Sequence, residues 1–236
     1  MKYIILPSQE QERLVYYLAA EEYVASELRE GFFLWQSRPT VIYGRNQDPR
    51  VEVNIPYCEA NGIEYYRRKS GGGCVYSDPG NIMLSFVTPG TDVEAIFSRY
   101  LDTLAGALRS LGLPAVVTTH NDILVDGRKV SGNAYFSTGG VGIVHGTLLY
   151  DEDFAAMSAS ITPSVQKLQS HGVQSVRQRC ANLTELGLKI SARELLAHLK
   201  EAFSQGEFQL GEDADARIRE IEAGYLDPEF IRGRFL

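Results

Sequence analysis

The chain has 236 residues, of which 44% are hydrophobic and 22% are charged. These proportions are typical of a globular protein that can bury a core, and they exclude an intrinsically disordered chain. The formal charge of −7 at pH 7 argues against a general nucleic-acid-binding protein. No apolar run approaches the ~20 residues of a membrane span, and the N-terminal apolar segment is too short for a signal peptide.

Hydrophobic periodicity predicts strands and helices along the whole chain. Apolar residues at helical spacing predict helices over residues 10–29, 54–61, 93–111, 151–160, 163–170, 191–205 and 213–223. Short apolar runs predict strands over residues 3–6, 32–35, 40–44, 63–66, 75–76, 82–87, 115–119, 123–125, 129–135 and 141–150. The Asp126-Gly127 pair predicts a hairpin turn. With no repeat or low-complexity linker, we expect one α/β domain rich in antiparallel strands, with a helical tail.

The three cysteines of the chain predict a protein with reduced thiols. Cys58, Cys74 and Cys180 are odd in number and show neither a metal-binding spacing nor a disulfide framework. Reduced thiols lead us to expect a cytoplasmic protein. The net charge and the short apolar runs lead us to expect that it associates with neither nucleic acid nor membrane.

Residues 67–81 contain a cationic, glycine-rich run that is followed by a turn. Arg67, Arg68 and Lys69 precede three successive glycines at residues 71–73. Glycines let another molecule approach the backbone closely, and their N–H groups can converge on an anion. The cations suit a carboxylate or a phosphate. The run therefore indicates an anion-binding loop, although the glycines alone are equally typical of a plain loop or hairpin.

Three further side chains have two interpretations each. Lys129 follows the predicted hairpin turn and is either a solvated strand residue or a fixed charge in a site. A lone histidine such as His145 is more often structural than catalytic. Trp35 is the only tryptophan, and it either packs in the core or forms the wall of an apolar pocket.

Three ordered stretches together strongly resemble the lipoate–protein ligase family. They are RRKSGGG at residues 67–73 with Val75, Tyr76 and Asp78, KVSGNA at residues 129–134, and HGTLL at residues 145–149. The likeness covers roughly residues 3–205 and also includes the stretches at residues 33–35, 42–47, 121–122, 175–177 and 182–186.

The resemblance implies a fold and a reaction. The implied fold is α/β (α+β), with mixed, largely antiparallel sheets flanked by helices, as in biotin ligases and class II aminoacyl-tRNA synthetases. The family reaction uses ATP, Mg²⁺ and lipoate to form lipoyl-adenylate. A lysine of an acceptor then takes the lipoyl group, the acceptors being apo lipoyl domains of 2-oxoacid dehydrogenases and the glycine-cleavage H protein.

The resemblance also assigns roles to residues of this sequence. Contacts with lipoate or the acyl-adenylate fall to Trp35, Arg68, Ser70, Gly71, Gly72, Gly73, Ser77, Asn81 and His145. Nucleotide contacts fall to Tyr76, Asn121, Lys129, Ser131, Gly132 and Ala134. Lys129 is the catalytic residue, a fixed positive charge that stabilises the intermediate. Asp122 is the expected Mg²⁺ ligand, because Mg²⁺ is held by one or two carboxylates together with phosphate oxygens.

The sequence departs from the family pattern in two places. Ser77 stands where many members have histidine, and serine carries no charge near neutral pH. Full ligases also have a separate C-terminal accessory domain, whereas we expect a catalytic domain over residues 1–205 and only a helical tail over residues 206–236. The chain is then either the large part of a two-part ligase with a separate accessory subunit, or a ligase that works without one.

Two other functions fit the resemblance. An ATP-independent octanoyl or lipoyl transferase of the same fold needs a cysteine nucleophile, and the loop before Lys129 has none, so we expect Cys74 to be a packing residue. A lipoate-binding protein without catalysis is the other alternative. For docking of acidic acceptor domains, Arg67, Arg177 and Arg179 are candidates, although the last two are more typical of a solvated face.

Overall fold

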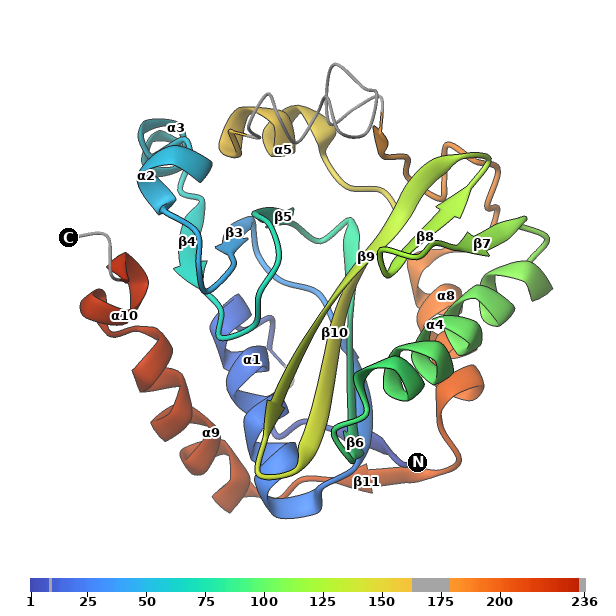
Figure 1. The fold of residues 1–236 in the computed structure, drawn as a ribbon, viewed down its shortest axis with the longest axis horizontal. Helices are drawn as coiled ribbons and strands as arrows, with labels where there is room; N and C mark the ends of the chain where they lie inside the picture. Colours follow the sequence, from blue (N-terminus) through green and yellow to red (C-terminus); the bar gives the residue numbers. More distant parts are fainter. Residues whose placement is uncertain (9, 163–178, 234–236) are drawn as a thin grey trace.

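The structure, a computed structural model, describes residues 1–8, 10–162 and 179–233. Two sheets form its centre, one with eight strands and one with three (Figure 1). In order across it, the larger sheet has β11 (Glu207–Gln209), β1 (Tyr3–Ile5), β2 (Gly31–Trp35), β6 (Asn81–Pro89), β10 (Val141–Leu149), β9 (Arg128–Thr138), β8 (Asp122–Val125) and β7 (Ala115–Val117). The smaller sheet has β4 (Glu64–Arg67), β3 (Thr40–Tyr43) and β5 (Val75–Ser77). β1 pairs in parallel with β11 and β2, as β3 does with β4, and the other pairs are antiparallel.

Helices surround both sheets. They are α1 (Leu14–Tyr23), which continues into the π-helix η1 (Val24–Leu28), α2 (Pro49–Glu52), α3 (Ile55–Ala60), α4 (Val93–Ser110), α5 (Phe154–Ser160), α8 (Ala192–Phe203), α9 (Glu212–Tyr225) and α10 (Pro228–Arg232). Side chains cap the first turns of α4 and α8. The Asp92 side chain accepts a hydrogen bond from the Ala95 N–H, and Ser191 and Glu194 form a reciprocal capping box.

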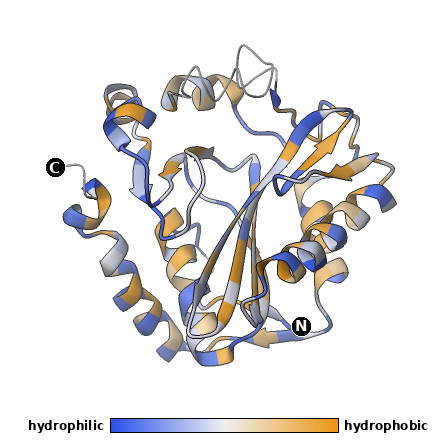
Figure 2. Ribbon diagram, viewed as in Figure 1, coloured by the Kyte–Doolittle hydropathy of each residue, from blue (hydrophilic) through white to orange (hydrophobic). Residues whose placement is uncertain are grey.

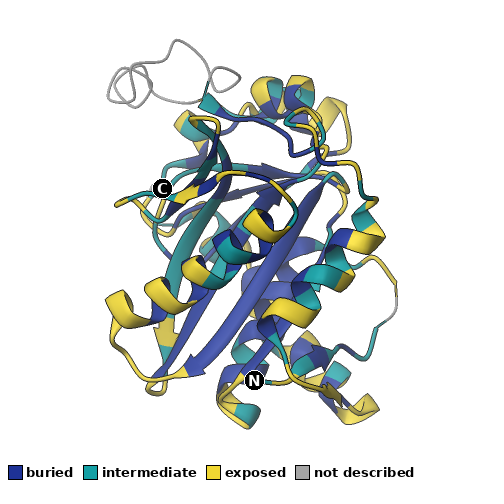
Figure 3. Ribbon diagram, turned by 90° about the vertical axis from the view of Figure 1, so that its right-hand side faces the viewer, coloured by how far each residue is buried: buried dark blue, intermediate teal, exposed yellow. Residues whose placement is uncertain are grey.

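The two faces of the larger sheet are buried by different helices. Along β6, Ile82, Leu84 and Phe86 pack into a core with α4 and α8, whereas Met83 and Val87 pack into a second core with α1 and α9. This alternation is what a strand with both faces buried requires. Hydrophobic residues accordingly follow the strands and the inner sides of the helices (Figure 2). Exposed residues lie on the outer sides of the helices, around a buried sheet (Figure 3).

A third core lies under the smaller sheet. It joins β3 and β5 to α3 and α5 through Val41, Tyr43, Tyr76 and Cys58, among others. β5 and β6 flank a turn in the sequence but belong to different sheets and do not pair. The chain therefore crosses from one sheet to the other at residues 78–80, which leaves room between the sheets.

Most predicted elements are present, and the expected mixed, largely antiparallel sheets flanked by helices are observed. The hairpin at Asp126-Gly127 joins β8 to β9 as predicted. The helices α2 and α10 and the strand β11 were not predicted, because each is too short to show periodicity. The helix predicted over residues 163–170 lies outside the described residues. No helix in the described ranges is long and apolar enough to cross a membrane.

The segment after residue 205 packs on the rest of the chain. Its strand β11 extends the larger sheet beside β1, and α9 lies against α1. Leu210, Ala214, Ile218 and Tyr225 are buried in the same core as α1. In the described residues after 205, α9 and α10 are helical, and the segment also supplies an edge strand and part of the core.

Candidate active site

A cavity of about 370 Å³ lies between the larger sheet and the smaller sheet. One face of the larger sheet forms its floor, because residues two apart on a strand and residues paired across strands share a face. The floor residues are Asn81, Met83, Gly132, Ala134, His145, Thr147 and Leu149. The opposite wall includes Leu14, Leu18, Ile42, Val75, Met157 and Ile161. The wall is thus mainly apolar, and polar groups occur at defined places on the floor.

The three successive glycines at residues 71–73, here called the glycine run, form one end of this cavity. Gly72 and Gly73 line it. Gly72 has a φ of +91°, which glycine adopts without strain. Glycine is also needed at position 44 for the loop to take this conformation, because a Cβ there would clash with the Gly72 carbonyl oxygen. Among the described residues, no acceptor lies within hydrogen-bond distance of the N–H groups of Gly71, Gly72 and Gly73. Successive free N–H groups of this kind can hold an anion.

The buried Arg68 guanidinium shapes this loop from inside. Its Nη2 donates to the carbonyls of Gly71 and Gly73, both at 2.7 Å, and its Nη1 donates to the Ile42 carbonyl at 3.1 Å. Burial lowers the pKa of Arg68 to about 10, which leaves it charged at neutral pH. Arg68 lines the cavity, but most of its hydrogen bonds hold the loop in place.

Arg67 does not belong to a docking surface, because it is only 2% exposed. Its guanidinium donates to the carbonyls of Arg45 and Gln47 at 2.8 Å, and to those of Phe230 and Arg232 at 2.9 Å. It therefore joins the loop after β3 to α10. The docking prediction for Arg67 was wrong, since the sequence gives no sign of this burial.

Lys129 stands at the mouth of the same cavity, beside Asp122. A register shift between β8 and β9 pairs Gly132 with Asp122 and Lys129 with Leu124, which brings Lys129 to the face that carries Gly132. The Lys129 ammonium lies over Gly132, where a Cβ would be 2.5 Å from Nζ. Gly132 therefore provides the space that the Lys129 side chain occupies.

Asp122 pairs with two cations. Its Oδ1 lies 2.8 Å from Lys129 Nζ, and its Oδ2 lies 2.9 Å from Arg179 Nη2. The side chains of Lys129 and Arg179 are 21% and 25% exposed. Arg179 thus lines the cavity and does not form part of a solvated face, while Arg177, the other docking candidate, lies outside the described residues. The cluster has two positive charges and one negative charge, which suits a ligand with phosphate groups.

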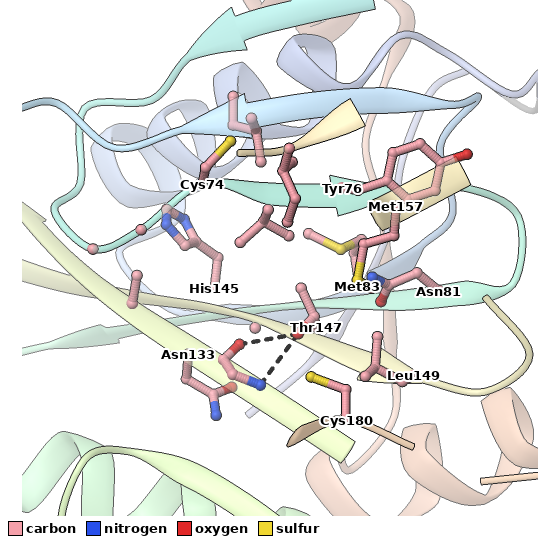
Figure 4. A pocket seen from close by; sticks show the side chains of 18 of the residues that line it. Cys74, Tyr76, Asn81, Met83, Asn133, His145, Thr147, Leu149, Met157 and Cys180 are labelled. Carbon is pink, nitrogen blue, oxygen red and sulfur yellow. Dashed lines mark hydrogen bonds between the residues drawn. The ribbon is translucent and has the colours of Figure 1, made fainter. Parts of the chain in front are cut away.

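His145 and Cys74 lie at the glycine end of the cavity, and Tyr76, Asn81 and Met157 lie at the other end (Figure 4). His145 Nε2 is 2.6 Å from Ser70 Oγ, and its Nδ1 is 2.9 Å from Glu21 Oε2. Sequence reasoning did not select Glu21, which lies on the apolar helix α1 and is 3% exposed.

Glu152 is a buried carboxyl at the Asn81 end of the cavity. Its Oε2 accepts a hydrogen bond from Asn81 Nδ2 at 3.2 Å, while its Oε1 has no partner among the described residues. Burial, followed by the nearby Asp78 charge, raises the pKa of Glu152 well above its ordinary value. Burial and the neighbouring charge of Asp78 therefore favour the protonated form of Glu152 at this end of the cavity.

Two thiols line the cavity. The backbone of Cys180 pairs with that of Lys129 in a single parallel β-bridge, so the two residues are neighbours in the cavity lining. Burial raises the pKa of the Cys180 thiol. A raised pKa disfavours the thiolate that a nucleophile needs. Cys74 is half-buried beside His145 (Figure 4).

The cavity brings together most, but not all, of the residues predicted for the site. Those that line it are Arg68, Gly72, Gly73, Tyr76, Asn81, Asp122, Lys129, Gly132, Ala134 and His145. Those placed elsewhere are Trp35, Ser70, Gly71, Ser77, Asn121 and Ser131. The lining residues that sequence reasoning did not select include Leu14, Leu18, Met83, Thr147, Glu152 and Cys180.

The residues placed elsewhere have structural contacts. Trp35 is 4% exposed and stacks on Tyr17, with ring centroids 4.4 Å apart. Ser77 is fully buried and receives a hydrogen bond from Ser37 Oγ at 3.1 Å. Ser131 faces the opposite side of the sheet from Gly132 because successive strand residues alternate.

The other three surround the cavity without lining it. The Asn121 carbonyl accepts a hydrogen bond from Asn133 Nδ2 at 2.8 Å. The Gly71 carbonyl binds Arg68, and Ser70 lies behind His145. These residues form hydrogen bonds with residues that line the cavity, and they do not line it themselves.

Asp122 is the described residue that best fits a bound Mg²⁺. The described residues contain no group of three or more His, Cys, Asp or Glu side chains that could hold a metal ion. A site completed by phosphate oxygens needs only one or two carboxylates. Asp122 meets this requirement, provided that the ion takes the place of one of its two cations.

Comparison with known proteins gives consistent matches. The lipoyl protein ligase A/B catalytic domain matches residues 14–204. Lipoate-protein ligase LplJ of Bacillus subtilis is 39% identical over 187 residues, which are 77% of this chain and 56% of that protein. Lipoate–protein ligase 1 of Staphylococcus aureus is 40% identical over 71% of this chain and 52% of its own length. The chain thus spans about half the length of these curated relatives.

A solved structure gives the same result for the fold. It comes from a structural analysis of an archaeal lipoylation system, a bi-partite lipoate protein ligase and its E2 lipoyl domain from Thermoplasma acidophilum. The TM-score is 0.85 at 26% identity, and the match covers 99% of this chain and 97% of that one. The predicted fold class is therefore confirmed, and the matched region contains the glycine run, Lys129 and His145. The chain belongs to the lipoate–protein ligase family, through its lipoyl protein ligase A/B catalytic domain.

Proposed function

We propose that this chain activates lipoate with ATP and transfers the lipoyl group to a lysine of an acceptor protein. The observation that carries the proposal is the position of Lys129. A strand irregularity and Gly132 place its ammonium at the mouth of a cavity that has one mainly apolar wall. Two kinds of relative support it, namely curated lipoate–protein ligases and a structure of lipoate-protein ligase A bound with ATP.

In the first step, a lipoate carboxylate oxygen forms a bond to the α-phosphorus of ATP, and pyrophosphate leaves. The free N–H groups of the glycine run, the Lys129 ammonium and the Arg179 guanidinium are charge-stabilising groups available here. Asp122 is the residue that would hold Mg²⁺, which neutralises phosphate charge when bound. The apolar wall, with Leu14, Leu18 and Ile42, suits the acyl chain and ring.

In the second step, an acceptor lysine attacks the acyl carbonyl, the amide bond forms, and AMP leaves. The attacking amine loses one proton. Lys129 is not the acylated nucleophile in this proposal, because its ammonium is engaged in an ion pair with Asp122 at 2.8 Å. Its charge instead stabilises the oxygen that becomes negative during the attack.

Lipoyl domains of 2-oxoacid dehydrogenases and the glycine-cleavage H protein are the proposed acceptors. An E2 lipoyl domain belongs to the archaeal system whose structure matches this chain. That system contains a bi-partite ligase, so a separate accessory subunit is part of the proposal.

Lipoate-dependent exchange of labelled pyrophosphate into ATP tests the activation step. The assay is run both without and with an added accessory subunit. We expect exchange that needs both lipoate and Mg²⁺, and we expect no exchange with Lys129→Ala. Exchange that is independent of lipoate, or unchanged in Lys129→Ala, would contradict the proposal.

A second candidate is ATP-independent transfer of an octanoyl or lipoyl group through a cysteine. The thiols of Cys74 and Cys180 in the cavity favour it, whereas the raised pKa of Cys180 disfavours it. We expect Cys74→Ala and Cys180→Ala to keep most of the ATP-dependent activity. Loss of acyl transfer from octanoyl-acyl carrier protein in either variant would favour the transferase instead.

A further inference from the structure

A chain of hydrogen bonds runs from the core to His145 and beyond it. Trp35 Nε1 donates to Ser85 Oγ at 2.9 Å, and Ser85 Oγ donates to Glu21 Oε1 at 2.6 Å. The other Glu21 oxygen lies 2.9 Å from His145 Nδ1, and His145 Nε2 lies 2.6 Å from Ser70 Oγ. All five side chains are buried or nearly so, with His145 the most exposed at 10% of its side chain.

The direction of each bond follows from the chemistry of its two groups. An indole N–H can only donate, so Ser85 Oγ accepts from Trp35 and gives its own proton to Glu21. An ionised carboxylate can only accept, so the proton between Glu21 and His145 belongs to His145 Nδ1. In neutral His145, Nε2 is then an acceptor.

The far end of the chain is compatible with the same arrangement. Arg68 Nε can only donate, and it lies 3.0 Å from Ser70 Oγ. Ser70 Oγ accepts from Arg68, and its own hydroxyl proton is then available for donation to an unprotonated His145 Nε2. Arg68 also holds the carbonyls of Gly71 and Gly73. In this arrangement the two serine hydroxyls each accept one hydrogen bond and donate one, and every other polar group in the chain has a partner.

We propose that Trp35, Ser85 and Glu21 are positioning residues that hold neutral His145 with its proton on Nδ1, and thereby fix Ser70, Arg68 and the glycine run over the acyl end of the cavity. Trp35 thus acts on the site through Ser85 and Glu21 rather than by lining the cavity. The arrangement presents an uncharged imidazole to the cavity, next to the glycine run, which suits an apolar ring better than a buried cation does.

The tautomer of His145 can be read without any substrate. Two-bond ¹H–¹⁵N NMR correlations distinguish a protonated ring nitrogen from an unprotonated one, and a His145→Gln variant assigns the signals among the four histidines. We expect a protonated Nδ1 and an unprotonated Nε2 at pH 8. In Glu21→Gln the amide can donate to Nδ1, so we expect the Nε2-protonated form to replace the first one.

Two milder variants test the inner part of the chain. Trp35→Phe removes the N–H and keeps a ring that can stack on Tyr17, and Ser85→Ala removes both of the Ser85 hydrogen bonds. Ser160→Ala is the matched control, because Ser160 is a fully buried serine whose hydroxyl has no partner among the described residues. Circular dichroism and thermal unfolding show whether each variant is folded.

The kinetic part of this inference rests on the proposed function. In pyrophosphate exchange we expect KM for lipoate to rise about tenfold in Ser85→Ala and about threefold in Trp35→Phe, with kcat changed by less than about twofold. The control should change neither constant. A merely structural role would lower the amount of active protein and leave KM unchanged.

The outcomes separate this inference from the proposed function. A wild-type His145 with its proton on Nε2 would overturn the inference, and so would unchanged KM and tautomer in Ser85→Ala and Glu21→Gln. If wild-type protein shows no exchange at all, the proposed function fails, but the tautomer measurement still decides the inference. In that case the dissociation constant for lipoate, measured by calorimetry on the same variants, is compared in place of KM.

Discussion

The two polar regions of the cavity are built differently. Around His145, buried side chains form one continuous chain of directional hydrogen bonds, in which each group has its partner. Around Lys129, partly exposed side chains form ion pairs, and one carboxylate serves two cations. Partly exposed ion pairs contribute little to stability and exchange easily, whereas buried hydrogen bonds are costly to break. We therefore propose that the His145 region shapes the end of the cavity that holds the acyl group. The Lys129 region then binds the charged groups that enter and leave during the reaction.

Replacing Lys129 gives the largest effect that this comparison predicts. In Lys129→Ala we expect acyl transfer to fall at least about 100-fold, because the fixed charge that stabilises the reacting oxygens is lost. Lipoate binding should change little, since its apolar wall remains. Single-turnover transfer and calorimetry measure the two properties. Loss of lipoate binding with intact transfer of bound lipoate would reverse the assignment of the two regions.

Gly132→Ala tests the position of Lys129 without removing it. The added Cβ would lie 2.5 Å from Lys129 Nζ and 2.7 Å from its Cε, so the ammonium must move. A misplaced catalytic group costs on the order of tenfold to a hundredfold in rate. Gly224→Ala on α9 is the control, because a Cβ there meets nothing within 4 Å. Equal kcat values for the two variants would show that the position of Lys129 over Gly132 is unimportant.

Asp122→Asn tests whether the ion pairs at the mouth of the cavity exchange with a ligand. Without the carboxylate, Lys129 and Arg179 have no counter-ion there, and ATP without Mg²⁺ should bind about three- to tenfold more tightly. The dependence of exchange on Mg²⁺ concentration should also shift to higher values. Calorimetry in a chelating buffer measures the affinity, and weaker binding of Mg²⁺-free ATP would argue that Asp122 orients the cations instead.

Glu152→Gln has the smallest expected effect, and it concerns stability. The raised pKa of Glu152 means that the folded protein keeps a proton that the unfolded chain releases above about pH 4.3. The stability that this proton confers is complete below that pH and falls as the pH rises above it. Glutamine removes the dependence and can still accept from Asn81. We expect Glu152→Gln to unfold at a higher temperature than wild type at pH 8, by about 1 kcal/mol in stability, and at a similar temperature at pH 4. A lower unfolding temperature at pH 8 would show that Glu152 is ionised and paired.

The sequence predicted the long elements well and the short ones poorly. α4 and the hairpin of β8 and β9 follow directly from apolar periodicity and the Asp126-Gly127 turn. The division of β5 and β6 between two sheets does not, because the sequence around a turn does not specify which strands pair. β11 has no apolar pattern and depends on β1 for its hydrogen bonds.

The site was predicted in part, and the misses share a cause. The motifs located Lys129, Gly132 and the glycine run, which the cavity brings together. They could not show whether a side chain faces the cavity or lies one layer behind it, as Trp35 does. Glu21 and Glu152 were missed because a carboxylate among apolar residues gives no sign of its partners. Their burial is set by tertiary contacts that no local pattern encodes.

The central claim is that the cavity around Lys129 supports ATP-dependent lipoylation. The most direct test is the intact mass of an apo lipoyl domain after incubation with this chain, Mg²⁺, ATP and lipoate, with and without an accessory subunit. A parallel reaction replaces ATP and lipoate with octanoyl-acyl carrier protein. We predict a lipoyl mass gain only where both ATP and lipoate are present, and none with Lys129→Ala. A gain from octanoyl-acyl carrier protein alone would establish the transferase instead, and no gain under any condition, with lipoate still bound, would leave a binding protein.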